Sequence, residues 1–115
     1  MDDKADRYCA AFHETIELLG RRWNGVILQA LLSGAERFGE VRQGVPGISD
    51  RLLTQRLREL ECAGLVTRIR PGESLAVPRY VLTEKGRALG PVLDAVSRWA
   101  ADWLRIADDG RLLER

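Results

Sequence analysis

Arginine and glutamine side chains recur on one side of the segment from Ser49 to Ala63. At about 100° per residue in a helix, Arg51, Gln55 and Arg58 share that side. The opposite side is apolar and carries Leu53, Leu57 and Leu60. Arginine can donate twice to guanine, glutamine can pair with adenine, and the major groove of DNA admits one helix. The segment is therefore predicted to read base edges with one side and to pack against a core with the other.

Three further polar residues lie around this predicted reading side. Ser49 offers an N-cap hydroxyl at the start of the helix, and Thr54 and Arg56 flank the reading side. Hydroxyl and guanidinium groups in such places usually contact phosphates, which position a protein on DNA without reading its sequence. Ser49, Thr54 and Arg56 are therefore predicted phosphate contacts.

An ordinary solvated helix surface is the alternative interpretation of the same residues. Glu59 and Glu61 lie on the same helix and could pair with Arg51 and Arg58. Charge on a helix surface is therefore weak evidence for DNA binding by itself.

The next element along the chain favours the DNA interpretation. Two alternating segments are predicted to form a hairpin that brings Arg68, Arg70 and Arg79 near an exposed loop containing Ser74. A basic loop beside a basic helix can straddle the DNA backbone and place an arginine beside the minor groove. Glu73 at the predicted tip argues against deep insertion. The predicted DNA contacts of the hairpin are Arg68, Arg70, Ser74 and Arg79.

Apolar spacing and turn residues predict the elements that position these side chains. Pro91 is expected to kink or break the last helix. The predicted helices span residues 7–19, 23–32, 39–44, 49–63 and 83–106, and the predicted strands span 65–70 and 79–82. The expected fold class is mainly α with a small antiparallel β-hairpin (α+β), in one domain covering residues 1–115.

Composition excludes several classes of protein. A chain of 115 residues with 45% hydrophobic and 30% charged residues is typical of one globular domain. The polar start lacks the features of a signal peptide and no long apolar run is present, so a cytoplasmic protein with no membrane partner is expected. The net charge of +1 gives no argument for nucleic acid, because a total can hide a local patch.

Catalytic and metal-binding motifs are absent from the sequence. His13 is the single histidine, and Cys9 and Cys62 are far apart and outside any metal-binding spacing. No glycine loop for phosphates, no nucleophile motif and no pair of carboxylates for acid and base chemistry is present. The chain is therefore expected not to be an enzyme and to need no metal or cofactor.

Several longer motifs together resemble the HxlR-type branch of the MarR-like transcriptional regulators. The motifs are GRRW at 20–23, RFGEVR at 37–42, PGISDRLLTQRLRELE at 46–61, GLV at 64–66 and YVLTEKG at 80–86. The resemblance implies a winged helix-turn-helix with N- and C-terminal dimerisation helices. It further implies a homodimer that places the two copies of helix 49–63 in successive major grooves of a palindromic operator, flanked by the wings at 71–78. Proteins of this type commonly repress a neighbouring gene and release DNA when a small molecule or a reactive electrophile arrives.

The family's pairing through its first and last helices has support in the sequence. Apolar residues in the last helix cover more of its surface than one core needs, and such a surplus usually marks an interface. The alternative is that Trp99 and Trp103 cover only the core of their own chain. The predicted interface residues are Phe12, Ile16, Leu93, Val96, Trp99, Trp103 and Ile106.

Cys9 is a candidate thiol sensor by the same resemblance. Some HxlR-type proteins use a cysteine near the start of the chain, usually in a Cys-Pro pair, whereas Ala10 follows here. Asp6 and Glu14 would raise the pKa of the thiol and Arg7 would lower it. Cys62, on the outward side near the end of helix 49–63, is the weaker candidate.

A rival function is a winged-helix module whose dimer interface binds a small ligand or a protein instead of DNA. The outward residues of helix 49–63 discriminate between the two functions. If the protein reads DNA, changing them to alanine should abolish operator binding and leave the dimer intact.

Overall fold

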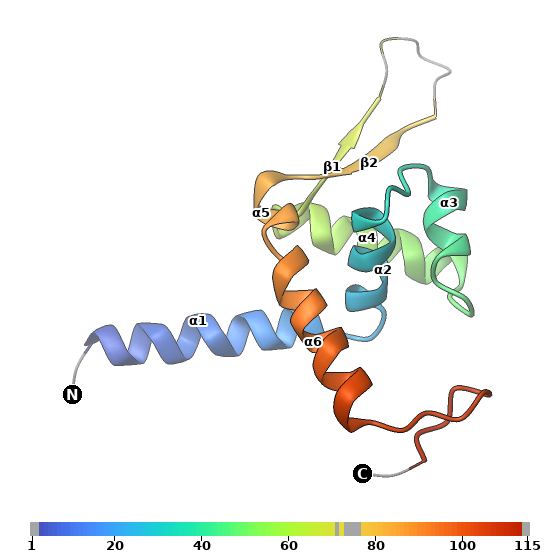
Figure 1. Cartoon of the computed structure of the whole chain (residues 1–115). Helices are drawn as coiled ribbons and strands as arrows, with labels where there is room; N and C mark the ends of the chain where they lie inside the picture. The colour runs from blue at the N-terminus through green and yellow to red at the C-terminus, as the bar shows by residue number, and fades with distance from the viewer. Residues whose placement is uncertain (1–2, 71, 73–76, 114–115) are drawn as a thin grey trace.

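The computed structural model describes residues 3–70, 72 and 77–113, and it describes side chains from Ala10 onward. It confirms the expected fold class, a mainly helical chain with one antiparallel hairpin (Figure 1). In chain order the elements are α1 Asp3–Gly20, α2 Asn24–Leu32, α3 Phe38–Gln43, α4 Asp50–Cys62, β1 Val66–Ile69, β2 Arg79–Leu82, α5 Glu84–Arg87 and α6 Gly90–Trp103.

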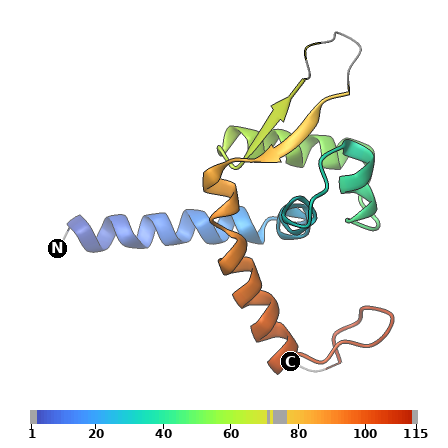
Figure 2. The ribbon, with the colours of Figure 1, turned by 45° about the horizontal axis from the view of Figure 1, so that its top comes forward.

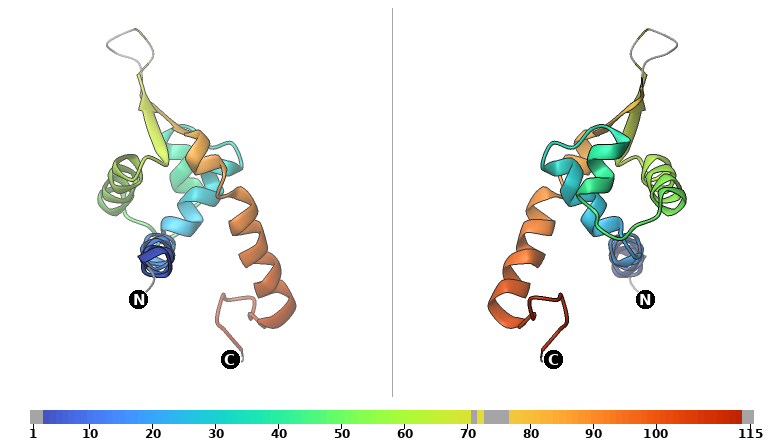
Figure 3. Two further views of the ribbon diagram at one scale, coloured as in Figure 1. Left: turned by 90° about the vertical axis from the view of Figure 1, so that its left-hand side faces the viewer. Right: turned by 90° about the vertical axis from the view of Figure 1, so that its right-hand side faces the viewer.

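The elements form a small body from which three parts project. Helices α2, α3 and α4 form the body, and the hairpin of β1 and β2 extends from one end of it (Figures 1 and 2). Helix α1 extends sideways from the body, whereas α6 extends away from the tip of the hairpin (Figure 1), and α4 lies on a different side of the body from α6 (Figure 3). Helix α4 and the predicted dimerisation helix α6 are thus presented on separate surfaces.

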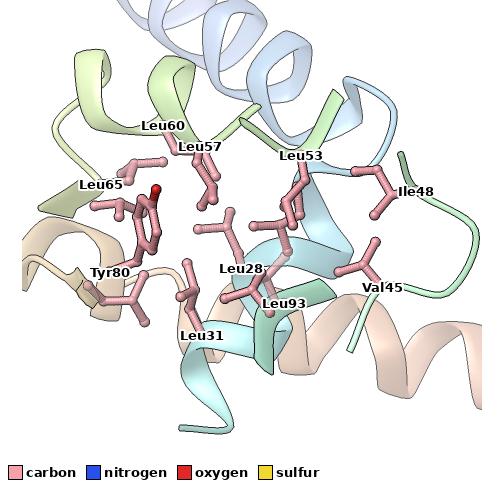
Figure 4. Close-up of a cluster of buried hydrophobic side chains, with 14 residues drawn as sticks. Leu28, Leu31, Val45, Ile48, Leu53, Leu57, Leu60, Leu65, Tyr80 and Leu93 are labelled. Atoms are coloured by element: carbon pink, nitrogen blue, oxygen red, sulfur yellow. The ribbon is translucent and has the colours of Figure 1, made fainter. Parts of the chain in front are cut away.

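One hydrophobic core holds α4 against α2. The predicted inward leucines of α4 are all buried: Leu53, Leu57 and Leu60. They belong to one cluster of buried side chains with Ile27 and Leu28 of α2, and Figure 4 shows Leu28 beside these leucines. Because burying one leucine contributes about 1.5–3 kcal/mol, these contacts dominate the attachment of α4 to the body.

Side-chain caps begin α4 and α5 at the predicted residues. The Ser49 hydroxyl oxygen accepts a hydrogen bond from the backbone N–H of Leu52 at 3.1 Å. The Thr83 hydroxyl oxygen accepts one from Gly86 at 3.1 Å. Each cap satisfies a backbone donor that has no partner within its helix.

A carboxylate fixes the start of α3. Glu40 accepts hydrogen bonds from the backbone N–H of Arg37 at 2.9 Å and of Glu36 at 3.1 Å. The bond from Arg37, then the bond from Glu36, lowers the pKa of this carboxyl below its ordinary value. The ionised carboxylate therefore stabilises the first turn of α3.

The base of the hairpin is joined to the helical body. β1 and β2 pair antiparallel with Val66 opposite Leu82 and Ile69 opposite Arg79. The Tyr80 N–H donates to the Glu36 carbonyl at 2.7 Å, which ties β2 to the segment before α3. The hairpin thus has a fixed origin relative to the helices.

The predicted interruption of the C-terminal helix near Pro91 is a break between two helices. Within the predicted range 83–106, α5 ends at Arg87 and α6 begins at Gly90, with Pro91 in its first turn. Proline fits there because the first turn needs no N–H donor, so Pro91 begins a helix and does not kink one. Helix α6 ends at Trp103, and Ile106 lies beyond it in a β-bridge with Leu112.

Two smaller differences concern the first half of the chain. Helix α1 begins at Asp3, before the predicted start at residue 7, and α3 begins at Phe38. In the described ranges, no helix is both long enough and apolar enough to cross a membrane.

Replacing Gly86 with alanine is expected to destabilise the fold by about 1–3 kcal/mol, because of overpacking. A Cβ at Gly86 would lie 2.2 Å from the carbonyl oxygen of Leu65, so α5 would have to move away from β1. Chemical denaturation measures the loss in unfolding free energy. The control is Gly39→Ala in α3, where a Cβ meets nothing within 4 Å. An equal effect of the two substitutions would contradict the clash.

Glu40→Gln is expected to lower stability at neutral pH and to have less effect in acid. The folded pKa of Glu40 is lowered, so its contribution is complete above the ordinary glutamate pKa of about 4.3. The contribution is lost as the pH falls through the lower folded pKa. Urea unfolding of both proteins from pH 7 to pH 3 measures this. A difference in stability that does not shrink in acid would contradict it.

Candidate nucleic-acid interface

The outward side of α4 carries the three predicted base-reading side chains. Arg51, Gln55 and Arg58 are all exposed, while the leucines on the opposite side are buried. Within the described residues, the guanidinium groups of Arg51 and Arg58 have no hydrogen bond or ion pair. Their donors are therefore free to bind an external acceptor.

The glutamates of α4 do not neutralise these two arginines. Glu59 instead contacts Arg56 at 3.1 Å and Arg21 at 3.3 Å. The pairing of Arg51 and Arg58 with glutamates of their own helix, one part of the solvated-surface interpretation, is therefore absent from the described part of the chain.

The two hydroxyl groups predicted to contact phosphate differ in their availability. The Ser49 oxygen accepts the cap hydrogen bond, which leaves its own O–H free to donate. The Thr54 hydroxyl donates to the Asp50 carbonyl at 2.9 Å. Because a phosphate oxygen accepts hydrogen bonds, Ser49 fits the predicted contact as it stands and Thr54 does so only after its hydroxyl rotates.

Arg56 is a structural residue, and its prediction as a phosphate contact is corrected. Its side chain is only 11% exposed, and its Nε donates to the Arg22 carbonyl at 3.0 Å. Its Nη1 donates to both carboxylate oxygens of Glu59, at 3.2 and 3.1 Å. The guanidinium therefore joins α4 to the junction of α1 and α2. A helical wheel places Arg56 on a flank but cannot show a partner 34 residues away.

The hairpin arginines fall into two groups. Arg68 and Arg70 are exposed and have no partner in the part of the chain that the structure describes. Arg79 is bound to Glu36 through both Nε, at 3.0 Å, and Nη2. Arg79 therefore links the base of the hairpin to the segment before α3, and its DNA contact, from a side chain that is 48% exposed, stays a prediction. Ser74 lies outside the described residues.

An ion pair that sequence reasoning missed holds α3 against the start of α4. Arg42 Nη1 donates to Asp50 Oδ1 at 2.9 Å across the turn between the two helices. The available signal was a pair of opposite charges on either side of the Pro46-Gly47 turn. Both side chains are more than half exposed, so the pair is a surface contact between the two helices.

Most of the predicted interface residues are exposed apolar side chains. Phe12 is 69% exposed and Trp103 70%, and these residues are joined by Ile16, Val96, Trp99 and Ile106. Leu93 is only 8% exposed and belongs to the core of its own chain, which corrects its place in the interface. A shallow apolar groove of about 610 Å³ runs along α6, lined by Pro91, Val92, Ala95, Val96 and Trp99.

The two cysteines are not equally described. Cys62 is a free, exposed thiol at the end of α4. The side chain of Cys9 lies outside the described residues, so its role as a sensor stays a prediction. In the described ranges, no group of three His, Cys, Asp or Glu side chains could hold a metal ion.

The family model described as HxlR-like helix-turn-helix matches residues 18–108. The chain is 38% identical to the HTH-type transcriptional regulator YodB of Bacillus subtilis, over 87% of this chain and 89% of YodB. It is 40% identical to the HTH-type transcriptional regulator YvaP of the same organism, over 84% of this chain and 89% of YvaP.

Solved structures agree with the sequence comparison. The reduced form of the redox regulator HypR superposes with a TM-score of 0.74 at 34% identity, covering 80% of this chain and 91% of HypR. The reduced form of YodB gives a TM-score of 0.72 at 37% identity, covering 86% of this chain and 94% of YodB. The chain therefore belongs to the HxlR-like helix-turn-helix family and is a winged-helix transcriptional regulator.

Proposed function

We propose that this regulator is a homodimeric repressor that reads a palindromic operator with one α4 in each half-site. It acts in the cytoplasm as a single winged-helix domain, by binding and not by catalysis. The observation that carries the proposal is the outward side of α4, where Arg51 and Arg58 have no partner among the described residues. Gln55 lies between them on the same side.

The chemistry of these side chains suits base edges. A free guanidinium can donate two hydrogen bonds to O6 and N7 of guanine, and a glutamine amide can pair with N6 and N7 of adenine. Arg68 and Arg70 on the hairpin are exposed cations that can contact the backbone or the minor groove beside it. Ser49 adds a phosphate donor at the start of the helix.

The exposed apolar side chains of α1 and α6 support a dimer. Trp99 and Trp103 are each more than half exposed, although tryptophan is among the side chains that gain most from burial. A second copy of the chain would cover this surface on both protomers at once, and a two-fold dimer is the commonest arrangement. Phe12, Ile16, Val96 and Ile106 complete the proposed interface.

A small molecule or an electrophile is proposed to release the protein from DNA. Relatives supply the support, since YodB has been solved in diamide-treated and quinone-bound forms and HypR in reduced and oxidised forms. In this chain the candidate thiol is Cys9, with Ala10 where a Cys-Pro pair would have proline.

Selection of bound sequences from a random double-stranded DNA pool at near-physiological salt tests the proposal directly. We expect a palindrome whose half-sites lie about one helical turn apart. Salt-sensitive binding without enrichment would contradict an operator reader and favour the rival, a module that binds a ligand or a protein at its dimer interface.

Arg58→Ala is expected to relax the preference at one base pair of each half-site and to cost about 1–3 kcal/mol of binding free energy. The reason is loss of a bidentate contact to guanine. Binding titrations against the operator and its single-base variants measure the effect. An equal loss on every sequence would make Arg58 a phosphate contact.

Trp103→Glu is expected to dissociate the dimer and abolish specific binding, because a charge cannot be buried in an apolar interface without a partner. Sedimentation at micromolar concentration measures the mass. The control is Ile69→Glu, which places the same charge at a 45%-exposed apolar residue on the hairpin. A dimeric Trp103→Glu protein would refute this interface.

A further inference from the structure

The carboxylate of Glu59, at the edge of the reading side, is contacted by donor groups of three residues. Its Oε1 accepts from Arg56 Nη1 at 3.2 Å and lies 3.3 Å from Arg21 Nη2. The same oxygen accepts from Gln55 Nε2 at 3.4 Å, and Oε2 accepts from Arg56 at 3.1 Å. The carboxylate is therefore held from two directions and touches one of the three base-reading side chains.

The donors that hold Glu59 are themselves fixed. Arg56 is almost buried and its Nε is bonded to the Arg22 carbonyl at 3.0 Å. Arg21 and Arg22 lie between the end of α1 and the start of α2, where Trp23 adopts a positive φ of 81°. The position of Glu59 is thus set by the junction of α1 and α2 as well as by its own helix.

Contact with Glu59 orients the Gln55 amide. At 3.4 Å the hydrogen bond is longer than usual, but its acceptor is charged, and only the NH₂ end of the amide can face it. The carbonyl end then points away from Glu59, and one N–H remains free. Arg51 and Arg58 have no comparable constraint within the described residues.

We propose that Glu59 is a positioning residue for DNA reading, which holds the Gln55 amide with its carbonyl oxygen toward the groove. An outward acceptor favours a base edge that carries an amino donor, N6 of adenine or N4 of cytosine. Without the carboxylate the amide can turn over and donate instead to guanine or to O4 of thymine. This inference rests on the proposed reading of DNA by α4.

The test is a double-mutant cycle of Gln55→Ala and Glu59→Ala, read out as base preference. The base pair at which Gln55→Ala relaxes the preference defines the position. We expect Glu59→Ala to lower the preference there by about threefold or more, a part of the roughly 5- to 160-fold that a good bidentate contact supplies. In the Gln55→Ala background, Glu59→Ala should leave the preference at that position unchanged.

The matched control separates orientation from charge. Glu61→Ala removes the same charge two residues away, from a carboxylate with no partner among the described residues. Because each substitution removes a negative charge, both should raise the affinity for DNA of any sequence. Only Glu59→Ala should change the base preference at the position read by Gln55. Should Glu59→Ala lose helical content or the dimer, Glu59→Gln replaces it, with a weaker, neutral acceptor and a smaller change at the same position.

Two results overturn the inference and differ from failure of the proposed function. In the first, the wild-type protein enriches an operator, and Glu59→Ala does not change the base preference at the position that Gln55→Ala defines. In the second, Glu59→Ala changes the base preference equally in the wild-type protein and in the Gln55→Ala background, which would make the role of Glu59 merely structural. If the wild-type protein enriches no operator at all, the proposed function itself fails and the positioning role falls with it.

Discussion

Burial of the leucine side of α4 is the constraint on which the rest of the structure depends. Leu53, Leu57 and Leu60 are almost fully covered, so the helix cannot rotate about its axis without exposing apolar surface. Because residues on a helix have fixed angular positions, anchoring one side determines what the other side presents. The outward direction of Arg51, Gln55 and Arg58 is therefore a consequence of core packing, and the DNA contacts themselves need contribute nothing to it.

Some arginines of α4 and the neighbouring elements are paired with carboxylates, and others are unpaired within the described residues. Arg42, Arg56 and Arg79 are each bound to a carboxylate: the first pair links α3 to α4, the second lies within α4, and the third links β2 to the segment before α3. Arg51 and Arg58 lack such partners in the described part of the chain. The net charge of +1 therefore includes two kinds of arginine. The paired arginines are bound to carboxylates of the same chain, and the unpaired arginines contribute positive potential at the surface.

Local patterns were sufficient to predict the elements and the outward side of α4. The leucine spacing, the Ser49 and Thr83 caps and the alternation in the hairpin each depend on residues close in sequence. The errors came from contacts between distant segments. Arg56 binds the carbonyl of Arg22, 34 residues away, and Leu93 enters a core formed mainly by other elements. The interruption near Pro91 was predicted, but the choice between a kink and a break was not, because proline within a helical pattern fits a kink or a first turn equally well.

The arrangement also connects α1 with the proposed reading residues without a large rearrangement. Arg21, which directly follows α1, contacts Glu59, and the next residue, Arg22, offers its carbonyl to Arg56. Since the core resists rotation of α4 as a whole, a shift of this junction acts most easily on the exposed side chains at the edge of the helix. Gln55 is the proposed reading residue in contact with that edge. Under the proposed function, a movement of α1 is therefore expected to change which bases the protein prefers as well as how tightly it binds.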